Sequence, residues 1–318
     1  MNNFKKIGLT ALAGSLVATS VAYAGELTAT GVAEMKMTNS SHLSSGKTVG
    51  MGNSVVLAGS GETDGGLNVS MSFELDSGVD TGTGTGPFDN HSVSIGNDSI
   101  GTVTVHGHGG SNSAAALDTT AAGDLWDSTL GITSSNDPDA AVSGNNLVVY
   151  SLPSLVDGLA LGASYSSDGE NDAGSIAYGA TYTGVEGLTL SFGKGEDNSA
   201  VNVDKDQTVM KVSYAYGPVT VGYSNNDYDH TTANSDQEVK SYNISYTLTD
   251  AISLSYGEET IEKVGTSSDI EVEGVSASYT SGGMTVAVKS VEATNVDYSN
   301  TAANNDNEMW KVALTFAF

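Results

Sequence analysis

Apolar and polar residues alternate along most of the chain, so that every second side chain is large and apolar. Residues 310–318 show the pattern most plainly, with Trp310, Leu314 and Phe318 on one side and small or polar residues between them. A period of two residues is typical of a β-strand with one apolar face. Chain ends are usually frayed and polar unless they are tied into structure. This last strand is therefore expected to be paired and covered by something apolar, for which lipid is the obvious candidate.

The same alternation predicts sixteen strands separated by turn residues. In the segment 67–75, for example, apolar residues from Leu67 to Leu75 form one face, while Asn68, Ser70 and Glu74 lie on the other. The expected strands are 27–37, 49–60, 67–75, 91–96, 102–106, 146–152, 159–166, 175–183, 188–194, 208–216, 219–225, 239–248, 252–258, 272–279, 284–291 and 309–318.

Short and long links alternate between these segments. Seven links are tight-turn sites rich in Gly, Asn, Asp and Pro. The eight others are long, polar and acidic, and the longest is 107–145. Strict alternation puts all turns on one rim and all long loops on the other, as in outer-membrane barrels. We therefore expect an all-β fold, a transmembrane antiparallel up-and-down β-barrel with about sixteen strands.

The start of the chain agrees with export. Residues 2–6 are basic, 7–21 are apolar and uncharged, and Ala22-Tyr23-Ala24 has small residues at the positions of a cleavage site. We expect a signal peptide over 1–24, cleavage after Ala24, and a single barrel domain over 25–318. The apolar run is shorter than the about 20 residues of a spanning helix, and only helices and closed barrels satisfy their backbone hydrogen bonds in a bilayer.

Composition narrows the function classes. Every cation is Lys, and removal of Lys5 and Lys6 with the leader leaves nine cations against 38 acids, a formal charge of −29. Such a surface repels nucleic acid, so no nucleic-acid partner is expected. The absence of Cys excludes disulfides and thiol catalysis.

Three stretches carry a family likeness. Residues 310–318 end on Phe318, residues 146–153 read Asn-Leu-Val-Val-Tyr-Ser-Leu-Pro before Gly158-Leu159, and the longest link follows the fifth expected strand. With the strand count, these stretches resemble the bacterial general porins, the trimeric sixteen-stranded diffusion channels of the outer membrane. The resemblance implies a homotrimer in lipid and lipopolysaccharide, and a third loop, 107–145, that folds into the lumen and narrows it. It also implies that the barrel-assembly machinery reads the closing strand, for which Trp310, Phe316 and Phe318 are the candidate signal.

The candidate constriction is acidic. The third loop carries five acids and no cation: Asp118, Asp124, Asp127, Asp137 and Asp139. Alternation places further charged residues on the lumen side: Glu34, Lys36, Glu74, Lys211, Lys289 and Lys311. The family resemblance implies a basic cluster, often of Arg, opposite the acidic loop. These lysines are scattered in the sequence, so we expect no such cluster. We predict a lumen of net negative potential that favours cations and small neutral or zwitterionic solutes.

Three other residues at the third loop have two possible roles each, one functional and one structural. His106 and His108 alternate, so they would share a face and could form a pH-sensitive restriction or ligate a metal with a loop acid. The alternative is simple polar lining. Trp126 could stack on a sugar or anchor the loop against the wall.

Acids outside the third loop are expected in surface loops, among them 168–172, 204–206, 227–229 and 258–262. They are either solvated charge that keeps loops soluble or ligands for loop-bound Ca²⁺ or Mg²⁺. No twelve-residue calcium loop is present. We expect no other cofactor.

The hypotheses for function are then few. No Gly-x-Ser-x-Gly or His-Glu-x-x-His motif points to an enzyme. The favoured function is a channel for passive diffusion of small hydrophilic solutes and ions, in which the small side chains of Ala29, Gly31 and Ala33 pack against a neighbouring subunit. The alternatives are a structural, adhesive or cation-binding barrel with a blocked lumen, or a channel selective for one solute.

Overall fold

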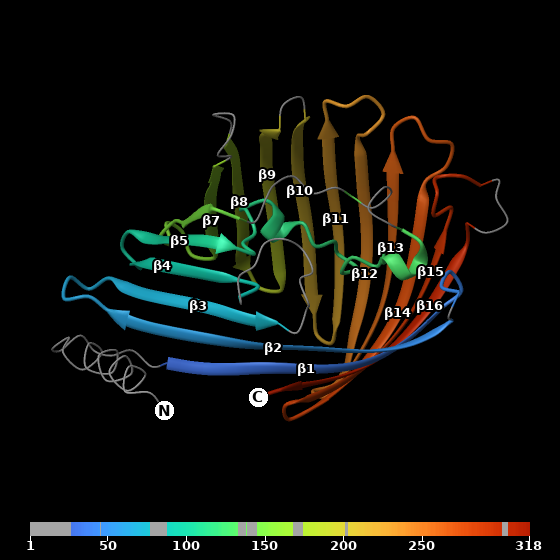
Figure 1. The fold of residues 1–318 in the computed structure, drawn as a ribbon, viewed down its shortest axis with the longest axis horizontal. Coiled ribbons are helices and arrows are strands. Elements are labelled where there is room, and N and C mark those ends of the chain that lie inside the picture. Colours follow the sequence, from blue (N-terminus) through green and yellow to red (C-terminus); the bar gives the residue numbers. More distant parts are fainter. Residues whose placement is uncertain are drawn as a thin grey trace, which may run out of the picture.

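The chain forms one closed antiparallel β-barrel of sixteen strands in the computed structural model (Figure 1). The structure describes residues 27–44, 46–76, 88–132, 138, 145–167, 174–200, 203–300 and 305–318. The expected signal peptide and its cleavage site lie outside the described residues. Among those described, no helix has the length and apolar character needed to cross a membrane.

Each strand pairs with its neighbours in sequence, and all sixteen expected strands are present. The strands are β1 Leu27–Ser40, β2 Lys47–Glu62, β3 Asn68–Asp76, β4 His91–Asn97, β5 Gly101–His108, β6 Leu147–Ser151, β7 Leu159–Ser167, β8 Gly174–Val185, β9 Leu188–Ala200, β10 Val203–Tyr216, β11 Val219–His230, β12 Gln237–Thr249, β13 Ile252–Lys263, β14 Ile270–Ser281, β15 Met284–Thr294 and β16 Asn307–Ala317. Two 3₁₀ turns, η1 Ala115–Leu117 and η2 Ser128–Leu130, lie between β5 and β6.

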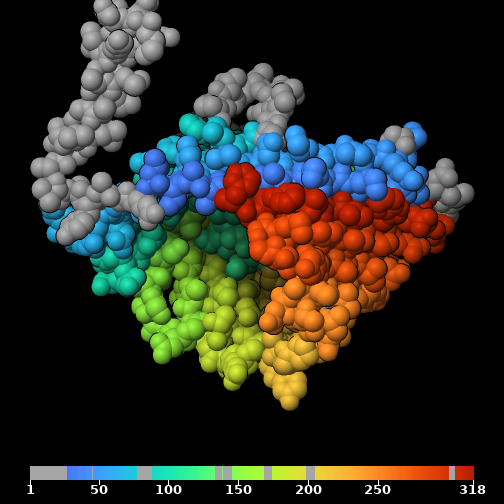
Figure 2. Space-filling model, turned by 90° about the horizontal axis from the view of Figure 1, so that it is seen from below, coloured from blue at the N-terminus to red at the C-terminus, as the bar shows by residue number. Residues whose placement is uncertain are grey.

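The barrel closes where the two ends of the chain meet. β1 pairs with β16, and Figure 2 shows the blue N-terminal strands lying along the red C-terminal strand. Beyond the last ladder pair, the Gly31 amide donates to the Phe318 carbonyl at 2.7 Å and the Phe318 amide donates back at 3.0 Å. A Cβ at Gly31 would lie 2.5 Å from the Phe318 ring. The terminal ring therefore covers the middle of the small face that the sequence offered to a neighbouring subunit.

The strands extend further toward the long loops than their alternation predicts. β9, β11 and β13 end at Ala200, His230 and Lys263, whereas the pattern predicted ends at 194, 225 and 258. The acids of 204–206, 227–229 and 258–262 therefore lie in strands, and their expected place in surface loops is wrong. Backbone pairing continues there although the apolar face has ended.

The change of face is clear on β13. Near the turn side, Ile252 and Leu254 point outward and Ser253 faces the lumen, whereas near the loop side Glu262 points outward and Ile261 is buried inside. Hydrocarbon does not tolerate a band of charges on the outer face. Glu258 is the first glutamate on this outer face, so the membrane belt ends below it.

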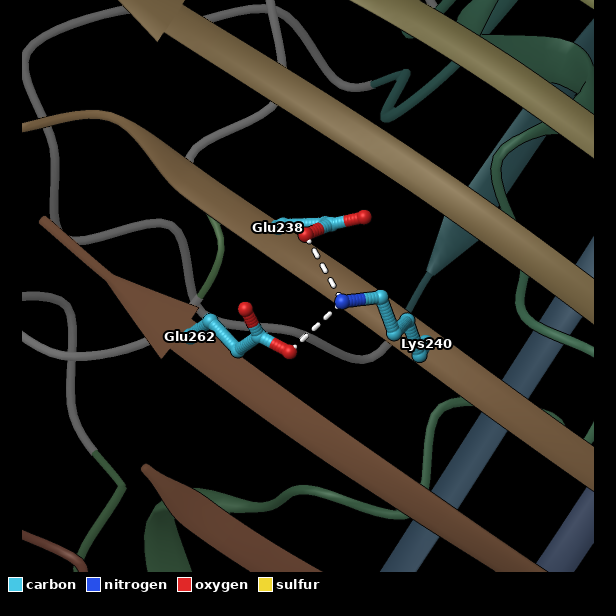
Figure 3. A network of polar contacts seen from close by, with 3 residues as sticks. All are labelled: Glu238, Lys240 and Glu262. Carbon is cyan, nitrogen blue, oxygen red and sulfur yellow. Dashed lines mark hydrogen bonds and ion pairs between the residues drawn. The ribbon is translucent and has the colours of Figure 1, made fainter. Parts of the chain in front are cut away.

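A bridged set of charges on the outer wall marks the same boundary (Figure 3). Lys240 on β12 lies between Glu238 of its own strand, at 2.9 Å, and Glu262 of β13, at 2.6 Å. All three side chains are partly exposed, so the pairs are worth little for stability. Because charges on the outer wall avoid hydrocarbon, they place the loop end of β12 and β13 outside it.

Four glutamates form a row beside this boundary. Glu258, Glu273, Glu292 and Glu308 stand directly opposite one another on β13, β14, β15 and β16. Like charges in this arrangement repel. Within the described residues, no group of three or more His, Asp or Glu is arranged to hold a metal ion. Loop-bound Ca²⁺ or Mg²⁺ therefore stays a prediction.

Candidate constriction site

The longest link turns into the barrel, as the sequence predicts. This third loop, 109–146, runs from β5 to β6, and the green segment in Figure 1 crosses the inner side of the tall strands. Its described part reaches from the wall at β7 to the wall at β16 and β1. This part of the loop therefore lies along the wall of the lumen.

Small residues allow the first half of the loop to lie close to the wall. A Cβ at Gly193 would stand 3.0 Å from Cα of Ala114, and a Cβ at Gly257 would stand 2.6 Å from Cβ of Ala122. Real Cβ atoms hardly ever approach to the second distance, so Gly257 cannot be enlarged unless the loop shifts. Because these wall positions are glycine, the loop backbone lies close to the wall. The two glycines therefore limit how far the loop projects into the pore.

Wall hydroxyls then bind the loop backbone. The Ala121 amide donates to Ser224 Oγ of β11 at 2.8 Å, and the Ala122 amide donates to Ser241 Oγ of β12 at 2.9 Å. Both serines are fully buried. Because a buried amide without a partner costs free energy, these bonds hold the loop at one height on the wall.

Glu259 of β13 anchors the loop through two hydrogen bonds. Its carboxylate accepts a hydrogen bond from the Leu125 amide at 2.7 Å and another from the Thr120 hydroxyl, and only 2% of the residue is exposed. The sequence placed it among solvated loop acids. Parity could have found it, because Glu259 continues the lumen face of Ser253 and Ser255.

Asp118 and Lys211 also hold the loop. The Asp118 carboxylate accepts from Gln207 Nε2 at 3.0 Å, and the Asp118 carbonyl accepts from Asn226. Burial raises the pKa of Asp118, with the nearby Asp124 carboxylate adding to the shift and Gln207 opposing it. Lys211 donates to the Thr119 carbonyl at 2.7 Å. Both are half-buried supports of the loop, although the sequence proposed them as pore-facing charges.

Asp124 and Asp127 lie further along the loop. Asp124 has a left-handed φ of 53° and its carboxylate accepts from the Thr120 amide at 2.9 Å. Asp127 caps η2 by accepting from the Thr129 amide at 2.8 Å. The third loop brings these two carboxylates close to Lys289 on the inner face of β15. Asp137 and Asp139 lie outside the described residues.

The second half of the loop is held by apolar packing. Leu125, Leu130 and Ile132 belong to a buried cluster with wall residues such as Ile261 and Val291. Trp126 packs against this cluster, which confirms its interpretation as an anchor. The lumen face of β12 to β16 is therefore not polar along its whole length, because the loop covers an apolar area there.

Lysines form a patch near these acids. Lys289 and Lys311 stand directly opposite each other on β15 and β16, and Lys36 lies diagonally on β1. Lys289 interacts electrostatically with Asp124 and Asp127 as well as with Glu259. The expectation that the basic cluster is missing is therefore wrong. Barrel closure brings together lysines from opposite ends of the chain.

The remaining candidates lie on β1, β3 and β5. Glu34 pairs with Lys36 at 3.5 Å on β1, and Glu74 on β3 accepts from Asn90 at 2.6 Å. A register shift between His91 and Ser92 breaks the alternation, so that His108 pairs with His91 and His106 with Ser92. The two histidines therefore do not lie on one face, contrary to the expectation from the sequence. The His108 ring instead contacts the Asp89 carbonyl.

Comparisons with known proteins agree with this geometry. A family model described as Gram-negative porin matches residues 8–285. An anion-selective porin from Comamonas acidovorans has the same fold, with a TM-score of 0.69 at 17% identity over 92% of this chain and 100% of that one. OmpT of Vibrio cholerae in its trimer form gives a TM-score of 0.67 at 15% identity, covering 93% and 100%. A mutant porin of Rh. blastica gives 0.65 at 15% identity, covering 92% and 100%. No curated protein matches the sequence.

Proposed function

The chain belongs to the Gram-negative porins, and on that premise we propose a water-filled, cation-preferring channel of the outer membrane for passive diffusion of small hydrophilic solutes. One observation carries the proposal. The third loop lies along one side of the lumen wall, bonded to Ser224, Ser241 and Glu259. A barrel of about 16 strands encloses more space than its own side chains fill. The described part of the loop therefore narrows the lumen without plugging it.

The same observation separates this function from its rival. A structural or adhesive barrel with a blocked lumen needs a plug, whereas the described part of the third loop stays on the wall. Conductance in planar bilayers tests the difference. We expect discrete current steps from the purified, folded protein, and folded protein without any steps would favour the rival. The family and the fold are those of channels rather than enzymes.

Cation preference is supported by the balance of charge in the lumen. Within the lysine patch of Lys36, Lys289 and Lys311, Lys289 interacts electrostatically with Asp124 and Asp127, while Glu34 neutralises part of the charge of Lys36. Asp118, Glu74 and Glu259 then remain against Lys211, and this negative excess attracts cations. The Comamonas relative is described as anion-selective, so selectivity has to be decided on these residues.

The reversal potential in a KCl gradient measures this preference. We expect the wild type to favour K⁺ and the Asp124→Asn variant to favour it less. Lys289→Gln should shift the reversal potential in the opposite direction. A wild-type potential on the chloride side contradicts the proposal.

A homotrimer is supported by strand length. β4, β5 and β6 have seven, eight and five residues, fewer than the about 9–11 that a strand needs to cross the hydrocarbon, whereas β9 to β14 have 12 to 14. A low wall with exposed Val93, Ile95 and Val105 is suited to a second copy of the chain. Light scattering in detergent should give three chains per particle, and Val93→Arg should give single chains.

The closing strand is the proposed assembly signal. Trp310 and Phe316 share the outer face of β16, and Phe318 continues it as a residue that is 75% exposed. The barrel-assembly machinery could therefore read the ring before closure. Phe318→Ala should slow insertion in cells, whereas Leu254→Ala, on the outer face of β13, should not. Equal rates would contradict the assignment.

A further inference from the structure

A cavity of about 250 Å³ opens to the lumen between the start of the third loop and the wall of β6, β7 and β8. Its lining includes Leu117 of η1, Val149 of β6 and Leu152, together with Ala160, Ser151 and Thr181. Most of the lining surface is apolar, which is unusual for the wall of a channel that carries hydrophilic solutes.

The lining contains no charged side chain. Other described cavities differ in this respect. One is lined by Glu258, Glu273 and Glu292, and another contains Lys289. Displacement of water from a charged group costs far more than displacement from an apolar or hydroxyl surface. A neutral solute can therefore enter this cavity without that cost.

The fold builds the cavity from local features. Gly162 and Gly179 leave the wall bare, and the Ser113 amide donates to Ser164 Oγ at 2.9 Å, which fixes the loop above it. Leu117 lies against the wall at Gly179, where an added Cβ would come within 3.3 Å of its Cδ1. The loop and wall thus hold the cavity open without a ligand.

We propose that this cavity is a weak binding site for small neutral solutes that combine an apolar face with hydroxyl groups. The apolar face would lie on Leu117, Val149 and Leu152, and the hydroxyls would meet Ser151 and Thr181. The volume is below the about 300–1,000 Å³ of sites for drug-sized ligands, which fits a single six-membered ring. The inference rests on the proposed channel, because the solute reaches the site from the lumen.

Two probes with the same carbon ring test the proposal. Cyclohexane-1,2-diol keeps an apolar face, whereas myo-inositol carries a hydroxyl on every carbon. Saturation-transfer NMR on the detergent-solubilised protein should show transfer to the diol and not to inositol. In planar bilayers the diol should lower the single-channel current more than inositol at equal concentration.

Three variants locate the effect. Ala160→Leu fills the cavity and Leu117→Ser removes part of its apolar surface, so each should abolish the difference between the probes although they change the free pore area in opposite directions. Ala58→Leu is the matched control, because Ala58 faces the lumen on β2 away from the cavity, and it should keep the difference.

Equal NMR transfer to the two probes overturns the inference, as does an unchanged difference in Ala160→Leu. The NMR readout does not depend on conduction. Probe binding without any current steps would therefore contradict the channel and leave the site standing, whereas current steps without preferential binding would contradict only the site.

Discussion

The two halves of the third loop are held to the same wall by different forces. Residues 113–124 carry small side chains and are fixed by hydrogen bonds to Ser164, Ser224 and Ser241. Residues 125–132 bury Leu125, Leu130 and Ile132 in an apolar cluster. The halves meet at a turn in which Gly123 and Asp124 both have positive φ, at 86° and 53°.

The difference shows that one half of the loop sets its distance from the wall and the other half contributes most of the free energy of docking. Hydrogen bonds are directional and fix the distance of the first half from the wall, but each contributes only about 1 kcal/mol net. Apolar burial has no direction and contributes more for each side chain. We therefore expect the second half to secure the loop and the first half to set the width of the pore.

The largest expected effect follows from loss of the apolar anchor. Leu130 is fully buried, and Leu130→Ala should weaken docking of the second half by about 3 kcal/mol. Hydrogen exchange of residues 125–132 should accelerate. Leu254→Ala, which removes the same atoms from the outer face of the barrel, should leave this exchange unchanged. If Leu130→Ala exchanges like wild type, the apolar cluster does not secure the loop.

Loss of the hydrogen bond at the junction of the two halves should have the next largest effect. Glu259→Ala leaves the Leu125 amide buried without its acceptor, which should cost about 2 kcal/mol. Single-channel recordings should then show flickering between conductance levels. Glu259→Gln keeps one carbonyl oxygen as an acceptor and should flicker less. Two variants that behave alike would show that the hydrogen bond is not what holds the junction.

Loss of one wall hydroxyl should act locally and more weakly. Ser241→Ala removes the acceptor of the Ala122 amide and should cost about 1 kcal/mol, with faster exchange at 120–123 and little change at 125–132. Ser253→Ala is the control, because Ser253 bonds to Ser278 on the wall at 2.7 Å. Equal acceleration in both halves would contradict their separate attachment.

The smallest effect concerns pH. Because the pKa of Asp118 is raised in the docked loop, the docked state binds more protons than the free state between the ordinary Asp pKa and the raised value. Docking of the first half should therefore weaken as pH rises through that interval and strengthen on acidification. Exchange at 113–124 measured against pH should show this slope, and Asp118→Asn should remove it. A slope of the opposite sign would contradict the assignment.

The fold could be predicted because lipid imposes an alternation that the sequence displays, as in Leu67 to Leu75. The strand ends could not, because above the membrane the outer residues become Glu258 and Glu262 while pairing continues. The alternation of polar and apolar side chains then no longer indicates the strand, although the backbone hydrogen bonds still define it.

The site was predicted in outline only. The loop and its acids followed from length and composition, but the lysine patch depends on the closure of β1 on β16, which brings Lys36 diagonally beside Lys311. The residues around each lysine in the sequence do not indicate that the two lysines lie side by side. Glu259 was hidden for another reason, since its acidic neighbours resemble a solvated loop.

The central claim is that the conducting channel holds the third loop on its wall, and a disulfide tests it most directly. The chain has no Cys, and a Cβ at Gly222 would lie 3.3 Å from that of Ala121, close to the about 3.5–4.5 Å of a disulfide. Ala121→Cys with Gly222→Cys should oxidise readily, and single-channel conductance should be the same before and after reduction. Failure to oxidise, or a conductance that changes on reduction, would contradict the account.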